Sequence, residues 1–280
     1  MQCTATLDII NKRVYEIQVS QAISFTNSTP LMDPERCLEH VRVRRNQRYT
    51  RQSSGTNFMA DSSQLQDWGN GVTSTQLLVH GNFESRHATR DFAVNVIELV
   101  QGADIPIIWA LDIGDQEGDV YTPSDILKYL ISQILQQNSH LLDERSAALS
   151  PIRFQNARTL RSWMDLLVSV LQGVPQVFLV LDLEVVAKCL TSETIAWQDL
   201  FQELFSRLAD MNSQTRVKVA FLSTKSSHRT GLGNFDERNI LRVPSNRNGA
   251  VKKPSWKESK GSRHRSAKNR RERLAKTILG

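Results

Sequence analysis

The fold of this chain is decided by residues Gln76–Val100, which read QLLVHGNFESRHATRDFAVNVIELV. The apolar run at the start predicts a buried strand, and the glycine that follows it opens a tight loop. Apolar residues spaced three and four apart from Phe92 to Val100 predict an amphipathic helix. A strand, a glycine-started loop and a helix in this order are the layout of a phosphate-binding loop.

The loop departs from the phosphate-binding pattern at the positions that contact a nucleotide. The pattern G-x-x-x-x-G-K-[ST] brings backbone N–H groups around the phosphates, reaches them with a lysine and binds Mg²⁺ with a hydroxyl. Gly81 supplies the first glycine. Arg86 stands in place of the second glycine, His87 in place of the lysine and Ala88 in place of the hydroxyl. A bulky arginine hinders close approach, histidine is shorter than lysine and mostly neutral at pH 7, and alanine cannot bind a metal.

Two interpretations of this loop remain open from the residues alone. The N-terminus of the helix still favours anions, so a nucleotide such as ATP with magnesium is one hypothesis for its ligand. The candidate nucleotide-binding residues are then Gly81, Ser85, Arg86, His87 and Thr89. The favoured interpretation is a structural strand–turn–helix corner that holds no cofactor.

Strands and helices alternate from Thr75 to Pro244, which predicts parallel β-α units. We expect an α/β fold in which a parallel sheet lies between two layers of helices. The expected strands are 76–80, 105–111, 176–182, 217–222 and 240–243. The expected helices in this region are 87–100, 122–137, 157–172 and 194–211.

The strand QVFLVLD ends in Asp182, the candidate metal ligand of the chain. A carboxylate at the carboxyl end of a parallel strand lies where α/β sheets bind their ligands. Mg²⁺ prefers oxygen ligands and also relies on the phosphates of the nucleotide. The alternative is that Asp182 caps a neighbouring helix or loop.

The predicted domains are an N-terminal extension (1–70), the α/β domain (71–245) and a disordered basic tail (246–280). The extension is expected to hold a short helix or strand around Leu7 to Val19, and a linker at 52–63. Asp33-Pro34 predicts the start of a further helix that runs to about Arg48. Its second half, VRVRRNQRYTR, is basic, and we interpret it as a solvated helix face rather than a contact for an acidic partner.

The basic character of the chain belongs to its tail. The net charge is +6, yet residues 251–280 hold 11 Lys and Arg against 2 Asp and Glu. The other 250 residues therefore hold 24 basic and 27 acidic residues. A tail of this composition is typical of nuclear import signals and nucleic-acid contacts, and also of solvating tails without a partner.

The remaining sequence features favour a cytoplasmic or nuclear protein without a membrane partner. No window is long and apolar enough for a membrane span, and the N-terminus lacks the pattern of a signal peptide. The three cysteines have no zinc-binding spacing and suggest no disulfide framework.

Three segments, LLVHGNFESRHAT, VFLVLDLE and VAFLSTKSS, occur in the order found in P-loop NTPases. From Gln76 to Pro244 the chain resembles the core of the STAND class, most like the degenerate NACHT-type domains of filamentous fungi. The segments stand in for Walker A, Walker B and the strand that leads to sensor 1. The resemblance implies a metal-coordinating role for Asp182, a second acid at Glu184, and a sensor position at Thr224 or Lys225. It also implies a nucleotide-controlled switch coupled to oligomerisation and signalling.

Three functional hypotheses follow. The favoured one is a non-catalytic interaction or scaffold protein that binds a protein partner and is not an enzyme. The second is a weak nucleotide-binding signalling NTPase with an atypical Walker A loop. The third is a nucleic-acid-associated protein that acts through residues 251–280.

Overall fold

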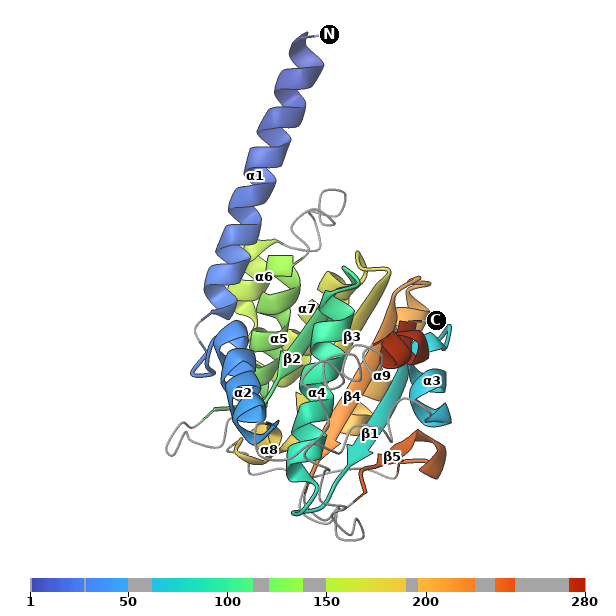
Figure 1. Ribbon diagram of the computed structural model, residues 1–280. Helices are drawn as coiled ribbons and strands as arrows, with labels where there is room; N and C mark the ends of the chain where they lie inside the picture. Colours follow the sequence, from blue (N-terminus) through green and yellow to red (C-terminus); the bar gives the residue numbers. More distant parts are fainter. Residues whose placement is uncertain are drawn as a thin grey trace.

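The computed structural model describes residues 2–27, 29–49, 62–112, 121–137, 150–189, 196–224, 235–244 and 272–279. These residues are built around a five-stranded parallel sheet with helices on both faces (Figure 1). The predicted α/β fold with a parallel sheet is confirmed. The predicted linker at 52–63 lies almost entirely outside the described residues.

All five predicted strands are present, with ends that differ by up to two residues from the prediction. They are β1 (Thr75–His80), β2 (Ile107–Ala110), β3 (Gln176–Asp182), β4 (Arg216–Ser223) and β5 (Ile240–Arg242). Their order in the sheet is β2-β3-β4-β1-β5, and every neighbouring pair is parallel. Every residue of β3 after Gln176 is buried, because helices cover the sheet on both sides.

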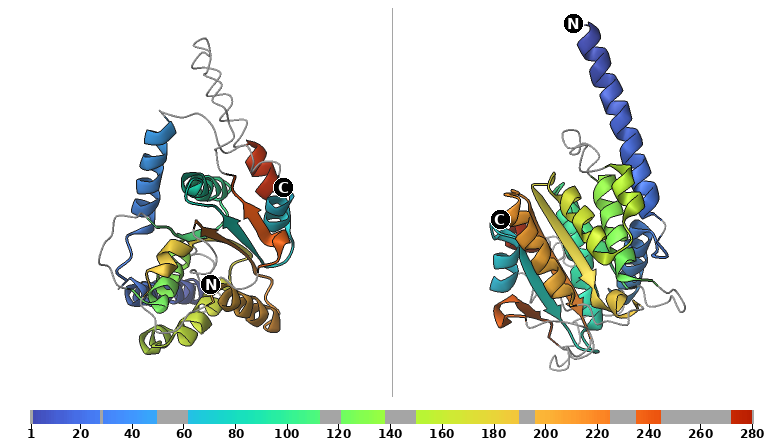
Figure 2. Two further views of the ribbon diagram at one scale, coloured as in Figure 1. Left: turned by 90° about the horizontal axis from the view of Figure 1, so that it is seen from below. Right: turned by 180° about the vertical axis from the view of Figure 1, so that it is seen from behind.

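Alternate residues of each strand face two separate hydrophobic cores. In β1, Leu78 faces one core, whereas Leu77 and Val79 face the other. The helices that contribute to the Leu77 core are α2 (Pro34–Tyr49), α3 (Ser63–Asn70) and α4 (Arg86–Gln101). The Leu78 core is formed with α5 (Pro123–Gln137), α6 (Pro151–Asn156), α7 (Leu160–Leu171) and α9 (Trp197–Asp210). Seen along the sheet, these two groups of helices form the outer layers of a three-layer sandwich (Figure 2).

The open edge of β2 is covered by glutamine side chains of α5. The side chain of Gln133 accepts a hydrogen bond from the backbone N–H of Trp109 at 3.0 Å and donates one to its carbonyl at 2.9 Å. Gln137 makes the same pair of bonds to Ile107, at 3.2 and 2.8 Å. These bonds satisfy backbone groups that an edge strand would otherwise offer to another chain.

A fully buried lysine anchors the segment that leads into β1. The Nζ atom of Lys218, on β4, donates to the carbonyls of Gly71 at 2.6 Å and Thr73 at 2.8 Å. Burial, together with the nearby charge of Arg216, lowers the pKa of Lys218 to about 8. The two carbonyl acceptors compensate the ammonium group for the loss of water.

The N-terminal extension begins with a helix that is longer than the predicted Leu7–Val19 element. Helix α1 spans Gln2–Thr26. Near its C-terminal end, the buried side chains of Val19 and Ala22 join the core formed with α5 and α6. The N-terminal part of α1 projects away from the body of the protein (Figures 1 and 2).

The basic face of α2 pairs with acidic residues of α4 in the same chain. Arg42 Nε lies 2.9 Å and Arg45 Nη2 lies 3.1 Å from Oε1 of Glu98. Arg48 Nη2 lies 2.8 Å from Oδ1 of Asp91, near the start of α4. The prediction of a solvated face is therefore wrong for these arginines, because α4 supplies carboxylates at matching intervals along the contact.

Part of the tail expected to be disordered is folded. Residues 272–279 form a helix whose Leu274 and Ile278 are buried in the same core as α3 and α4. The backbone of this helix passes so close to Gly69 of α3 that a Cβ there would lie 2.5 Å from the carbonyl oxygen of Ile278. Leu274 and Ile278 lie about one helical turn apart, so they share a helix face that is buried although the residues around them are basic. The rest of the basic tail lies outside the described residues.

None of the helices in the described ranges has the length and apolar character needed to cross a bilayer.

Candidate functional site

The predicted loop lies at the topological switch point of the sheet. The chain leaves β1 toward β2 at one edge, whereas it leaves the neighbouring strand β4 toward β5 at the other edge. Open α/β sheets bind ligands beyond the carboxyl ends of their strands at such a point. Gly81, directly after β1, donates its N–H to the carbonyl of Ser223, the last residue of β4, at 2.8 Å. The loop therefore occupies the position where this class of fold binds its ligands.

Hydrogen bonds between Asn82 and Ser85 close the loop on itself. The N–H of Asn82 donates to Oγ of Ser85 at 2.8 Å, and the N–H of Ser85 donates to Oδ1 of Asn82 at 2.9 Å. The hydroxyl of Ser85 is buried and lies 3.1 Å from the same Oδ1. The backbone N–H groups of Asn82 and Ser85 are thus satisfied within the loop rather than left for a bound anion.

Gly81, Ser85 and Thr89 are brought together as the sequence predicted, but they contact one another. A Cβ at Gly81 would lie 2.4 Å from Oγ1 of Thr89 and 2.9 Å from Oγ of Ser85. The hydroxyl of Thr89 donates to the carbonyl of Ser85 at 3.2 Å. The glycine is therefore required by the packing of these two hydroxyls, whether or not a phosphate binds.

Arg86 and His87 do not reproduce the lysine of a phosphate-binding loop. The guanidinium of Arg86 lies 3.8 Å from the ring centroid of Phe83 and donates to the Phe83 carbonyl at 3.1 Å, so it folds back on its own loop. His87 is half-buried, and its Nδ1 has no hydrogen-bond partner among the described residues. Burial lowers the pKa of His87, and the cations of Arg48, Arg86 and Arg90 lower it further. Both effects favour the neutral imidazole over the cation.

Asp182 caps a helix, the role that the sequence left open as the alternative to metal binding. Its Oδ1 accepts the N–H of Glu184 at 3.0 Å at the start of α8 (Leu183–Ala187). Its Oδ2 accepts the N–H of Asp112 at 3.3 Å. Burial raises the pKa of Asp182 from 3.8 to about 7, although these backbone N–H groups and Arg90 favour the ionised form. A metal ion here would have to displace the proton of this carboxyl group as well as its two backbone N–H partners.

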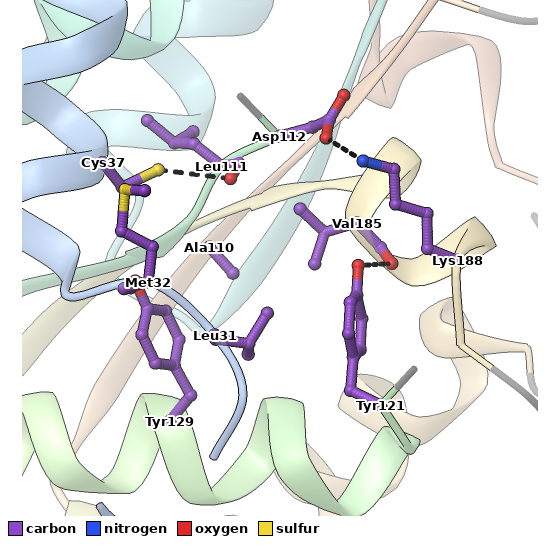
Figure 3. A pocket seen from close by; sticks show the side chains of 10 residues that line it. All are labelled: Leu31, Met32, Cys37, Ala110, Leu111, Asp112, Tyr121, Tyr129, Val185 and Lys188. Atoms are coloured by element: carbon purple, nitrogen blue, oxygen red, sulfur yellow. Dashed lines mark hydrogen bonds and ion pairs between the residues drawn. The ribbon is translucent and has the colours of Figure 1, made fainter. Parts of the chain in front are cut away.

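Asp112 follows β2 and forms two ion pairs at the carboxyl end of the sheet. Its Oδ2 lies 3.1 Å from Nη2 of Arg90, on α4. Its Oδ1 lies 2.6 Å from Nζ of Lys188, which follows α8 (Figure 3). Asp112 thereby links α4, on one face of the sheet, to the residue that follows α8, on the other face.

A small cavity lies beside these ion pairs. Its lining residues are Leu31, Met32, Cys37, Ala110, Leu111, Asp112, Tyr121, Tyr129, Val185 and Lys188 (Figure 3). Its volume is about 30 Å³, which is room for about one or two water molecules. Pockets for small-molecule ligands measure several hundred Å³, so a nucleotide does not fit here. Burial, followed by the charges of Asp182 and Asp112, raises the pKa of the Cys37 thiol to about 12, so this cysteine is not a reactive thiolate.

The other predicted site residues are only partly placed. Thr224 donates its hydroxyl to Oε1 of Glu184 at 3.2 Å, which joins the predicted sensor position to the predicted second acid. Lys225 lies outside the described residues. Within the described residues, no three His, Cys, Asp or Glu side chains are grouped so that they could hold a metal ion.

The side chains that close the site have only weak signals in the sequence. Asn82 falls at an unspecified position of the phosphate-binding pattern, although Asn and Ser three positions apart are strong turn formers that bond to nearby backbone. Lys188 carried no sequence signal, because its distance from Asp112 is set by the packing of α8 against the sheet.

Neither a scan of protein-family models nor a search of curated proteins gives a match to this chain.

Proposed function

We propose that this chain is a non-catalytic interaction or scaffold protein built on a degenerate STAND/NACHT-like P-loop fold. The observation that carries the proposal is the closed loop at the switch point. The side chains of Asn82 and Ser85 each accept a hydrogen bond from the other's backbone N–H group. The hydroxyls of Ser85 and Thr89 pack against Gly81. A phosphate would have to displace these bonds before it could bind.

The carboxylate that would hold magnesium also serves another purpose. Asp182 caps α8 and accepts a second backbone N–H from Asp112. A metal at this position would compete with both hydrogen bonds and would lack the hydroxyl ligand that Ala88 cannot supply. Both halves of a nucleotide site are therefore occupied by contacts that stabilise the fold.

A second candidate function is weak binding of an anion or nucleotide at the same loop. It is favoured by the positive charges around the N-terminus of α4, where Arg48, Arg86 and Arg90 surround His87. Against it, Arg48 pairs with Asp91 and Arg90 pairs with Asp112.

The two functions are separated by calorimetric titration of the purified chain with ATP, ADP and GTP, with and without Mg²⁺. A scaffold gives no heat of binding and no thermal shift at millimolar nucleotide. Micromolar affinity that Arg86→Ala removes would establish the second function instead. Arg86→Ala is preferred to Gly81→Val, because any side chain at Gly81 meets Thr89 and disturbs the loop in either case.

The third hypothesis, a nucleic-acid contact through residues 251–280, stays a prediction. Its test is binding to DNA and RNA across a range of salt concentrations, for the full chain and for a chain with a charge-neutralised tail.

A further inference from the structure

The projecting part of α1 carries an apolar stripe. Leu7, Ile10, Val14 and Ile17 are each about half exposed. Their spacing is three, four and three residues, which corresponds to positions a, d, a and d of a heptad repeat. Large apolar side chains at this spacing form the contact seam of a coiled coil.

The contacts that anchor α1 to the body leave this stripe uncovered. Val19, Ala22 and Thr26 are buried against the body. At 100° per residue, these anchoring residues point roughly 140° away from the stripe around the helix axis. The direction of the stripe instead continues through Gln21 and Ser24, which are exposed and polar. The apolar stripe therefore belongs to the projecting part alone and does not contribute to the core.

We propose that this stripe binds the α1 helices of further copies of this chain in a parallel coiled coil. The inference builds on the proposed scaffold role, because it names the partner that the scaffold binds. A stripe with two apolar positions in seven is the pattern of a coiled-coil seam, whereas a helix that lies on a membrane needs a wide apolar face and a strongly basic opposite face. Glu16 lies beside Lys12 and Arg13 on α1, so the exposed surface is of mixed charge.

The residues beside the stripe favour a parallel arrangement of identical chains. Arg13 occupies position g and Gln18 the following position e. In a parallel pair, Arg13 of one copy faces the neutral Gln18 of the other. In an antiparallel pair, Arg13 faces Arg13, and the like charges repel each other.

The residues in the seam favour more than two helices. Isoleucine at both d positions, Ile10 and Ile17, with Leu7 at an a position shifts the preference of parallel coiled coils toward trimers and tetramers. The described seam covers only about two heptads, and helices this short are marginal on their own, so its association is expected to depend strongly on protein concentration.

Two neighbouring isoleucines provide a matched experiment. Ile10 is 51% exposed and lies in the stripe, whereas Ile9 is 56% exposed and lies outside it. We would measure the molar mass of the full chain by sedimentation and light scattering over a wide concentration range, without nucleotide. The wild type and Ile9→Glu are expected to rise from 31.8 kDa toward about three or four times this mass. Ile10→Glu is expected to stay at the mass of one chain with an unchanged melting temperature.

A wild-type chain that stays monomeric at the highest concentration would overturn the inference, as would equal behaviour of the two variants. A monomer that binds vesicles of anionic lipid through the stripe would also overturn it, in favour of a membrane surface. Because no nucleotide is present, the result is independent of whether the loop after β1 binds phosphate.

Discussion

Replacing Asp182 with asparagine tests whether this carboxyl group serves the fold or a metal. Asp182 is only 4% exposed, and burial raises its pKa from 3.8 to about 7. Arg90 opposes this shift, and Asp112 adds to it. Asparagine keeps the size of the side chain and the oxygen that caps α8, but it does not titrate.

The sign of the effect follows from linkage. A carboxyl group whose folded pKa is raised contributes stability that is fully present below its unfolded pKa and is lost as the pH rises through its folded pKa. Between about pH 5.5 and pH 8, the free energy of unfolding of the wild type is expected to lose about 2 kcal/mol through Asp182. Asp182→Asn lacks this loss, so its stability relative to the wild type is expected to rise by about the same amount.

The assay is urea unfolding of both proteins at several pH values. Asp67→Asn, at an exposed position, is the control for the removal of a carboxyl group as such. The comparison of slopes is insensitive to the constant cost of the hydrogen bond between Asp182 and the N–H of Asp112, which asparagine weakens. Equal pH dependence of Asp182→Asn and the wild type would refute the reasoning. It would show that Asp182 is ionised throughout, as a metal ligand requires.

Three further substitutions test contacts that the fold depends on. Arg45→Met removes an ion pair to α4 and is expected to lower the free energy of unfolding by about 1–2 kcal/mol in low salt and by less in high salt. The control is Arg36→Met at an exposed position, which is expected to have little effect. Gly69→Ala is expected to cost about 1–3 kcal/mol and to release the C-terminal helix to proteases, because the new Cβ meets a backbone oxygen at 2.5 Å. Gln133→Leu is expected to cost about 2–3 kcal/mol in urea unfolding, because it leaves the buried N–H and carbonyl of Trp109 without their partner.

Each substitution has an outcome that contradicts its premise. Equal effects of Arg45→Met and Arg36→Met would mean that the α2–α4 ion pairs contribute nothing to stability. An unchanged protease pattern for Gly69→Ala would mean that the C-terminal helix is not held at this contact. A stable Gln133→Leu protein would mean that water satisfies the edge of β2.

The strands and long helices were predictable because their signals are local. The run QVFLVLD predicts a strand buried on both faces, and β3 spans the same residues, Gln176–Asp182. The start of α5 has an equally local signal, since Thr122 and Asp125 exchange the bonds of a capping box. Residues 272–279 were missed because their surroundings are basic, while their burial depends on Gly69, about two hundred positions away in the chain.

The candidate site was predictable in its position but not in its contacts. The sequence placed Gly81, Ser85 and Thr89 at one corner, and the structure brings them together there. It did not show that Ser85 bonds to Asn82, because the partner of a hydroxyl depends on the turn that the backbone adopts. The pairing of α2 with α4 was also hidden, since its arginines and carboxylates lie about fifty positions apart in the chain.

The most direct test of the central claim is calorimetric titration of the full chain with ATP, ADP and GTP, in the presence and absence of Mg²⁺. Because the side chains of Asn82 and Ser85 already bind each other's backbone N–H groups, we expect no heat of binding and no rise in melting temperature at millimolar nucleotide. A saturable, magnesium-dependent heat with micromolar affinity, abolished by Arg86→Ala, would contradict the account. It would show that the loop opens and binds phosphate.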